Sequence, residues 1–142
     1  MKELAPLEML IGDWLGKGKG SYGPFTVEAH TERRGRWLLM CHEIKVPIVH
    51  ITTYVSTQVY GFDGQGLTLD YFDTAGAFRF HGQRHESALH FEWREGTNRK
   101  TSRYWAEGEM LHFAYESIVR DEGSDDVKHE TYEGTLERAP KD

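Results

Sequence analysis

The sequence of 142 residues has little of what several protein classes require. It contains a single cysteine, Cys41, so no disulfide can form within the chain, and nothing in its cysteine usage suggests secretion. The net charge is -6 and no large basic cluster stands out, which argues against a nucleic acid or membrane surface as partner. No apolar run approaches a membrane span, and the N-terminus does not resemble a signal peptide. We therefore expect one cytoplasmic domain covering residues 1–142.

Helical periodicity is confined to the start of the chain. Leu4, Leu7, Leu10 and Ile11 recur at helical spacing and predict a short helix over residues 4–11, which would brace one end of the fold. No later segment repeats this period. The remainder of the chain must therefore form another kind of regular structure.

From residue 13 onward the chain consists of about ten segments with strand-like alternation or β-rich composition, each bounded by Gly, Pro, Asp or charged turn residues. The predicted strands cover residues 13–22, 25–33, 36–46, 52–61, 66–72, 77–82, 87–94, 100–106, 109–118 and 128–138. The turns between them are short, as at Gly23-Pro24, so strands adjacent in sequence should pair in space. Closing such a meander removes its exposed edges. We predict an all-β fold, a ten-stranded antiparallel up-and-down β-barrel of the lipocalin or calycin type with a short N-terminal helix.

The first predicted strand has an unusual pattern. Glycines at positions 16, 18 and 20 alternate with Lys17 and Lys19, so one face carries no side chain and the other is charged. Trp14 and Tyr22 share the glycine face and would close its two ends. A strand whose inner face lacks side chains predicts a hollow beside it.

The side chains predicted to face inward indicate a ligand pocket. We assign the more apolar face of each strand to the interior, because the outside of a soluble barrel is wet. The resulting interior is aromatic with scattered polar groups, which suits a pocket for a small hydrophobic or aromatic molecule. A filled core with tyrosine hydroxyls at its rims is the alternative. The predicted ligand-binding residues are Met40, His42, Tyr54, Gln58, Tyr71, Phe91, Trp93, Tyr104, Phe113 and Tyr115.

Most of the eight histidines fall on outward positions or in connections, so we predict no metal site. His42 has an inward position and suits either a hydrogen-bonded wall residue or the acid/base group of a small barrel enzyme. No catalytic motif such as G-x-S-x-G is present, and no catalytic residue is assigned. The outward residues His90 and His112 are equally compatible with a homodimer face.

The direction of His129 depends on the last strand. If Tyr132 and Leu136 face inward, His129 faces outward; if Thr131 and Thr135 face inward, His129 does too.

Residues 10–22, L-I-G-D-W-L-G-K-G-K-G-S-Y, resemble the first strand of the nitrobindin-like proteins, G-x-W-x-G-x-G-x-G-x-Y. Later motifs resemble a broader family of lipocalin-like barrels of unassigned function, and these motifs are Gly35-Arg36-Trp37-Leu38, Tyr60-Gly61-Phe62-Asp63, Tyr71-Phe72-Asp73 and E-G-T-x-x-R over residues 133–138. Both resemblances imply a barrel. The nitrobindin-like one also implies a ferric haem ligated by a histidine of the last strand, for which His129 is the only candidate. The broader family implies no cofactor and leaves the ligand open.

Overall fold

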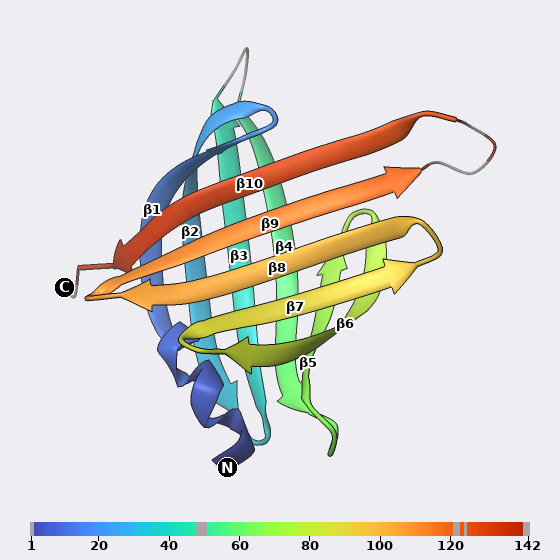
Figure 1. Cartoon of the computed structure of the whole chain (residues 1–142). Helices are drawn as coiled ribbons and strands as arrows, with labels where there is room; N and C mark the ends of the chain where they lie inside the picture. Colours follow the sequence, from blue (N-terminus) through green and yellow to red (C-terminus); the bar gives the residue numbers. More distant parts are fainter. Residues whose placement is uncertain (1, 48–50, 121–122, 124, 141–142) are drawn as a thin grey trace.

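The computed structural model describes residues 2–47, 51–120, 123 and 125–140. One short 3₁₀ helix, η1 (Lys2–Leu10), precedes ten strands. The strands are β1 (Gly12–Gly20), β2 (Gly23–Arg34), β3 (Trp37–Pro47), β4 (Ile51–Phe62), β5 (Leu67–Asp73), β6 (Gly76–His85), β7 (Ala88–Glu95), β8 (Asn98–Glu107), β9 (Met110–Arg120) and β10 (Val127–Arg138). Each strand pairs antiparallel with its neighbour in sequence, and β10 pairs with β1, so the sheet closes into a barrel (Figure 1). The predicted all-β barrel is confirmed and fits a calycin-like fold.

One predicted turn is wrong. Gly23 and Pro24 belong to β2, and the turn between β1 and β2 is Ser21-Tyr22, because Gly20 pairs with Gly23. Two hydrogen bonds to Thr131 extend the contact of this segment with β10 as far as Ser21. The Ser21 amide donates to the Thr131 carbonyl at 2.9 Å, and the Thr131 amide donates to the Ser21 hydroxyl at 2.8 Å. The contact with β10 therefore continues one residue beyond the end of β1, into the turn.

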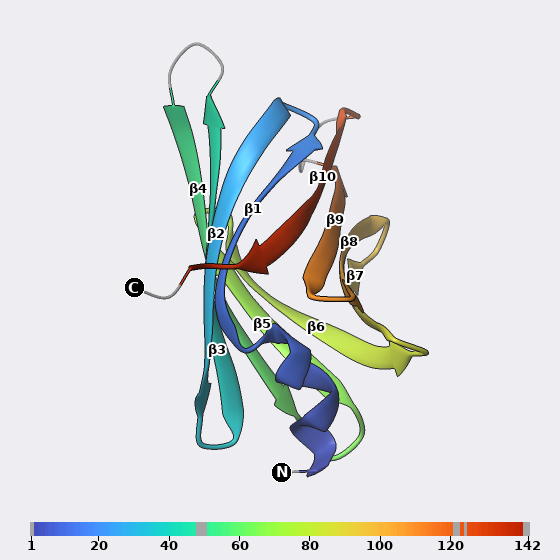
Figure 2. The same cartoon turned by 90° about the vertical axis from the view of Figure 1, so that its left-hand side faces the viewer.

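The N-terminal helix closes one end of the barrel (Figure 2). Its three leucines, at positions 4, 7 and 10, are almost fully buried. Their spacing of three residues matches a 3₁₀ helix, in which residues i and i+3 lie on the same face. The Trp14 indole nitrogen also donates a hydrogen bond to the Leu10 carbonyl at 3.0 Å, which ties the helix to β1. No helix of the described residues is long and apolar enough to cross a membrane.

The glycine face of β1 does not border a hollow, in contrast to the prediction from its sequence. A Cβ atom on Gly16, Gly18 or Gly20 would overlap a backbone carbonyl oxygen of β10. Side chains also cover this face, as Leu136 does beside Gly16. The glycines therefore permit close approach of two strands, one of the ordinary uses of glycine in a sheet.

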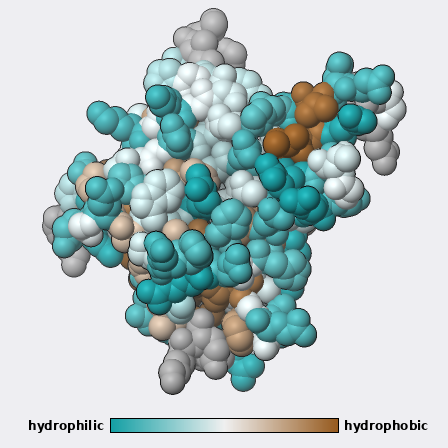
Figure 3. Space-filling view, viewed as in Figure 1, coloured by the Kyte–Doolittle hydropathy of each residue, from teal (hydrophilic) through white to brown (hydrophobic). Residues whose placement is uncertain are grey.

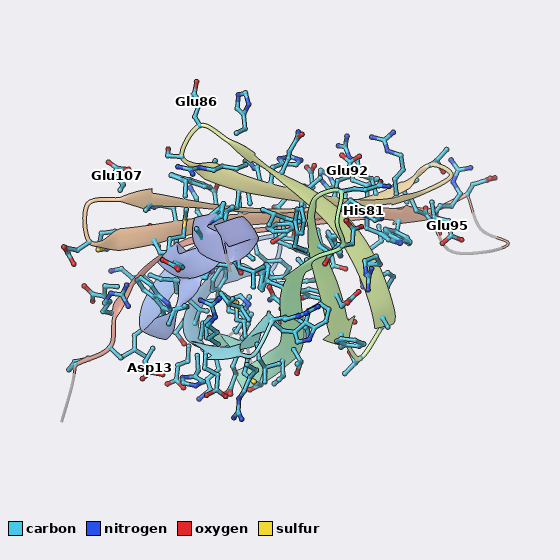
Figure 4. The ribbon with its side chains drawn as sticks, turned by 90° about the horizontal axis from the view of Figure 1, so that it is seen from below. Asp13, His81, Glu86, Glu92, Glu95 and Glu107 are labelled. Atoms are coloured by element: carbon cyan, nitrogen blue, oxygen red, sulfur yellow. The ribbon has the colours of Figure 1, made fainter. Side chains whose placement is uncertain are left out.

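The barrel interior is filled at the end nearest η1. Large side chains that are almost wholly buried gather there, and they include Leu38, Met40, Tyr60, Leu69, Phe80, Leu89, Phe91, Leu111 and Leu136. The outside is largely hydrophilic in the view of Figure 3. Acidic side chains project from the hairpin ends, as Glu86, Glu95 and Glu107 do in Figure 4. The assignment of apolar faces to the interior thus describes this half of the barrel well.

Replacing Gly18 by alanine should destabilise the protein by about 2–3 kcal/mol, because the added methyl group meets the Glu133 carbonyl and forces β1 and β10 apart. Urea unfolding followed by circular dichroism measures the effect. The matched control is Gly66→Ala, where the added Cβ has only an ordinary contact of 3.5 Å with the Gly82 carbonyl. Equal stability of the two variants would contradict the close approach.

Candidate functional site

A cavity of about 250 Å³ lies in the half of the barrel away from η1, and no residue of η1 lines it. Buried side chains of β3, β4, β8 and β9 form its walls. Exposed residues at the start of β4, in the β5–β6 turn and at the start of β10 surround its mouth, and these include Tyr54, Thr74, Ala75 and Lys128. The same barrel therefore has one filled half and one hollow half.

Seven of the ten predicted ligand-binding residues border this cavity, and they are His42, Tyr54, Gln58, Tyr71, Tyr104, Phe113 and Tyr115. The other three lie outside its lining. The Met40 sulfur lies in the filled half of the barrel and accepts a hydrogen bond from the Tyr104 hydroxyl at 3.5 Å. Phe91 packs edge-on against Tyr60, and Trp93 packs edge-on against Phe78. Ligand binding by any of these residues stays a prediction.

A chain of hydrogen bonds forms one wall of the cavity on β4. The Tyr60 hydroxyl donates to the Gln58 carbonyl oxygen, and the Gln58 amide nitrogen donates to the Ser56 hydroxyl at 3.1 Å. Burial raises the pKa of Tyr60 well above its usual value and raises that of Tyr104 to about 12. Both tyrosines are therefore neutral hydrogen-bonding groups at physiological pH.

His42 has one ring nitrogen without a partner. The residue is 7% exposed and packs edge-on against Phe113, with ring centroids 5.4 Å apart. Its Nε2 atom is buried and makes no hydrogen bond to any residue that the structure describes. Such an atom normally finds a partner inside a protein. Because His42 borders the cavity, a polar atom of a bound molecule is a candidate partner.

The protonation state of His42 also bears on catalysis. Burial lowers its pKa to about 4, so the ring is neutral at physiological pH. A general base works best when its pKa lies near the working pH. The environment of His42 therefore favours a hydrogen-bonding role over acid/base catalysis.

Lys100, on β8, places a buried positive charge on the cavity wall. Its side chain shares the inward face with Ser102 and Tyr104, and the residue is 7% exposed. The Nζ atom donates hydrogen bonds to the Ser117 hydroxyl at 3.1 Å and to the Tyr115 hydroxyl at 3.4 Å. It also lies 4.7 Å from the centre of the Phe78 ring. Burial lowers the pKa of Lys100.

Further charged groups lie at the mouth. Lys128 and Glu130 form an ion pair at 3.1 Å, and the Tyr132 hydroxyl donates to Glu130 at 3.4 Å. An oxygen of Asp73 accepts a hydrogen bond from the Ala75 amide at 2.8 Å in the β5–β6 turn. Each of these two acidic groups thus has a partner already.

His129 lies outside the barrel. Tyr132 and Leu136 face inward, which decides between the two orientations that the sequence left open. The His129 side chain is 55% exposed, and its Nε2 atom lies 2.9 Å from a Glu116 oxygen. A haem inside the cavity would not reach this ring, so the residues do not fit a haem held through His129. No group of three or more His, Cys, Asp or Glu suited to a metal ion occurs among the described residues.

The prediction missed Lys100, Ser117, Glu130 and Tyr132, although a signal for each was present. Lys100 lies two residues before Ser102 and four before Tyr104, so it shares their inward face of β8. In the same way, Ser117 continues the inward face of Tyr115 on β9. Glu130 and Tyr132 follow from the inward choice on the last strand. Assignment of the more apolar face to the interior does not by itself select charged or polar residues near strand ends.

His42 should make stability depend on pH. Its folded pKa lies below the ordinary 6.5, so the unfolded chain binds more protons between those two values. The contribution of neutral, buried His42 to the free energy of unfolding is complete above about pH 6.5 and declines as the pH falls toward 4. The free energy of unfolding should therefore fall by about 2 kcal/mol between pH 7 and 4.5 on account of His42. Urea unfolding at both values should show a smaller loss for His42→Gln. The exposed control His81→Gln should behave as the unmodified protein, and equal losses in all three proteins would contradict the assignment.

No protein-family model and no curated protein matches this chain. The functional argument therefore depends on the cavity and the groups that line it.

Proposed function

We propose that the barrel binds a small, largely apolar aromatic molecule in the cavity between β3, β4, β8 and β9. The observation that carries the proposal is the combination of the cavity with the unpartnered Nε2 atom of His42. Aromatic side chains such as Phe113 and Tyr71 supply apolar surface, and a few polar groups are available to orient the ligand. Small-molecule sites usually have this composition.

The size of the cavity limits the ligand. At about 250 Å³ it is smaller than the range of roughly 300–1,000 Å³ that is typical of pockets for drug-sized ligands. One or two fused aromatic rings with a small polar substituent suit such a space, and a longer molecule would extend through the mouth past Tyr54. The stack of Tyr54 on Tyr22, with centroids 6.3 Å apart, forms part of this mouth.

Neither alternative function has a specific observation in its favour. Enzymatic acid/base chemistry at His42 conflicts with its low pKa. The nitrobindin-like haem site would require a ligating histidine within reach of the cavity at position 129, and that ring lies on the outer face. Simple binding accounts for the buried polar groups without a further assumption.

Isothermal titration calorimetry with benzyl alcohol, indole and 2-naphthalenemethanol tests the proposal with neutral probes. We expect at least one of them to bind with one site per chain and a Kd of roughly 10–100 μM, since small ligands gain a fraction of a kcal/mol per heavy atom. Absence of saturable binding by all three would contradict the proposal.

Ser102→Leu should weaken this binding about tenfold, because Ser102 is buried on the cavity wall and the larger side chain occupies ligand space. The matched control is Thr101→Leu, which makes a similar change on the neighbouring residue, whose side chain belongs to the opposite face of β8. Equal affinities of the two variants would place the probe outside the cavity.

A further inference from the structure

We propose that the ligand of this cavity carries a single carboxylate and that Lys100 binds it, with the Tyr115 and Ser117 hydroxyls beside it. This inference deepens the proposed function and depends on it. It identifies the chemical class of the ligand, an aromatic monocarboxylate, and the point of the cavity wall at which the acid group would lie.

The first observation is that the Lys100 ammonium forms no ion pair with any residue that the structure describes. Within the described part of the chain, its only hydrogen bonds are to the neutral hydroxyls of Tyr115 and Ser117. An ammonium has three donors, so one N–H remains for a further acceptor. The side chain borders the cavity, and an oxygen atom of a ligand there can accept this hydrogen bond.

The second observation concerns energy. A buried charge is costly unless an opposite charge compensates for it. At Lys100 the Phe78 ring, two hydroxyls and the charges of Asp73 and Glu130 offset part of that cost, but neither acid lies close enough to form an ion pair with the ammonium. A ligand carboxylate would accept the remaining N–H of Lys100 in a charge-assisted hydrogen bond, which is about twice as strong as a neutral one. The hydroxyls are suited to help, because each can also donate to a ligand oxygen.

The neighbouring acids favour one negative charge over two. Asp73 and Glu130 border the same cavity, and both raise the pKa of Lys100 through their charges. Glu130 is already paired with Lys128, and Asp73 already accepts the Ala75 amide. A monocarboxylate matches the single free ammonium, whereas a phosphate monoester would bring a second negative charge close to both acids.

Four probes of nearly equal shape separate the effect of charge from that of fit. These are 2-naphthoate, 2-naphthamide, 2-naphthylmethylammonium and 2-naphthyl phosphate, titrated by calorimetry at neutral pH. We expect 2-naphthoate to bind at least about tenfold more tightly than 2-naphthamide, and more tightly than the cation and the phosphate. A preference for the amide, the cation or the phosphate would overturn the proposal.

Lys100→Met tests the assigned residue. Methionine keeps an apolar side chain of similar reach, and the substitution removes the desolvation cost of a buried ammonium that no ion pair offsets. The variant should therefore fold, with a Tm equal to or above that of the unmodified protein. It should bind 2-naphthamide within about threefold of the original affinity and lose the preference for 2-naphthoate. A retained preference, or a lowered Tm with unchanged naphthoate affinity, would assign Lys100 a structural role instead.

Lys128→Met is the matched control. It removes the same charge at the mouth, from a lysine that is exposed and already paired with Glu130. The naphthoate preference should persist in this variant, and its loss would mean that the general field of the mouth, and not Lys100, selects the anion. If none of the four probes binds the unmodified protein although benzyl alcohol or indole does, the carboxylate assignment fails; if no neutral probe binds either, the proposed function itself fails. If the amide and the carboxylate bind equally, only the carboxylate assignment fails.

Discussion

The pairing of β10 with β1 is the constraint on which the rest of the molecule depends. It closes the sheet, so neither β1 nor β10 presents an open edge. The pairing requires glycine at 16, 18 and 20, because a Cβ atom at each of these positions would meet the backbone of β10. A closed barrel of ten strands encloses more space than η1 and the leucines can fill at one end. The cavity in the other half is a consequence of closure.

The composition of the interior changes along the barrel axis. Near η1 the side chains are aliphatic and aromatic and pack without solvent, as Leu7, Leu38 and Leu111 do. Toward the mouth the buried residues become polar, with Ser56, Gln58 and His42 on β3 and β4 and with Lys100 and Ser117 on β8 and β9. Hydrogen bonds satisfy most of these groups, but among the described residues His42 Nε2 has no hydrogen-bond partner and the Lys100 ammonium forms no ion pair. A bound molecule would gain the most binding free energy from polar contacts at these two residues.

Much of the fold could be predicted from the sequence because alternation in a strand determines which side chains share a face. The ten strands and the inward position of residues such as Gln58 follow from this rule, and the short helix follows from the helical spacing of its leucines. Depth along the barrel does not follow from it. Met40 and His42 are two residues apart on one face of β3, yet His42 borders the cavity and Met40 lies in the filled half. The packing of η1 and the opposite strands decides that difference.

The glycine face and Lys100 illustrate two other limits. Absent side chains on β1 suggested a hollow, but the partner strand occupies that space. Lys100 is not among the predicted ligand-binding residues, and a lysine is usually exposed. In β8 its ammonium is instead held by Ser117 and Tyr115 of the neighbouring strand, a pairing that depends on the register of β8 and β9. Local sequence patterns predict which side chains share a face of a strand. Buried charges and cavities depend on the residues that other strands place against that face.

A crystal structure of the protein grown with 2-naphthoate tests the central claim most directly. Our account predicts electron density for the fused rings inside the cavity, against His42 and Phe113, with a carboxylate oxygen within about 3 Å of Lys100 Nζ. Density only on the outer surface, or a cavity filled by rearranged side chains, would contradict it.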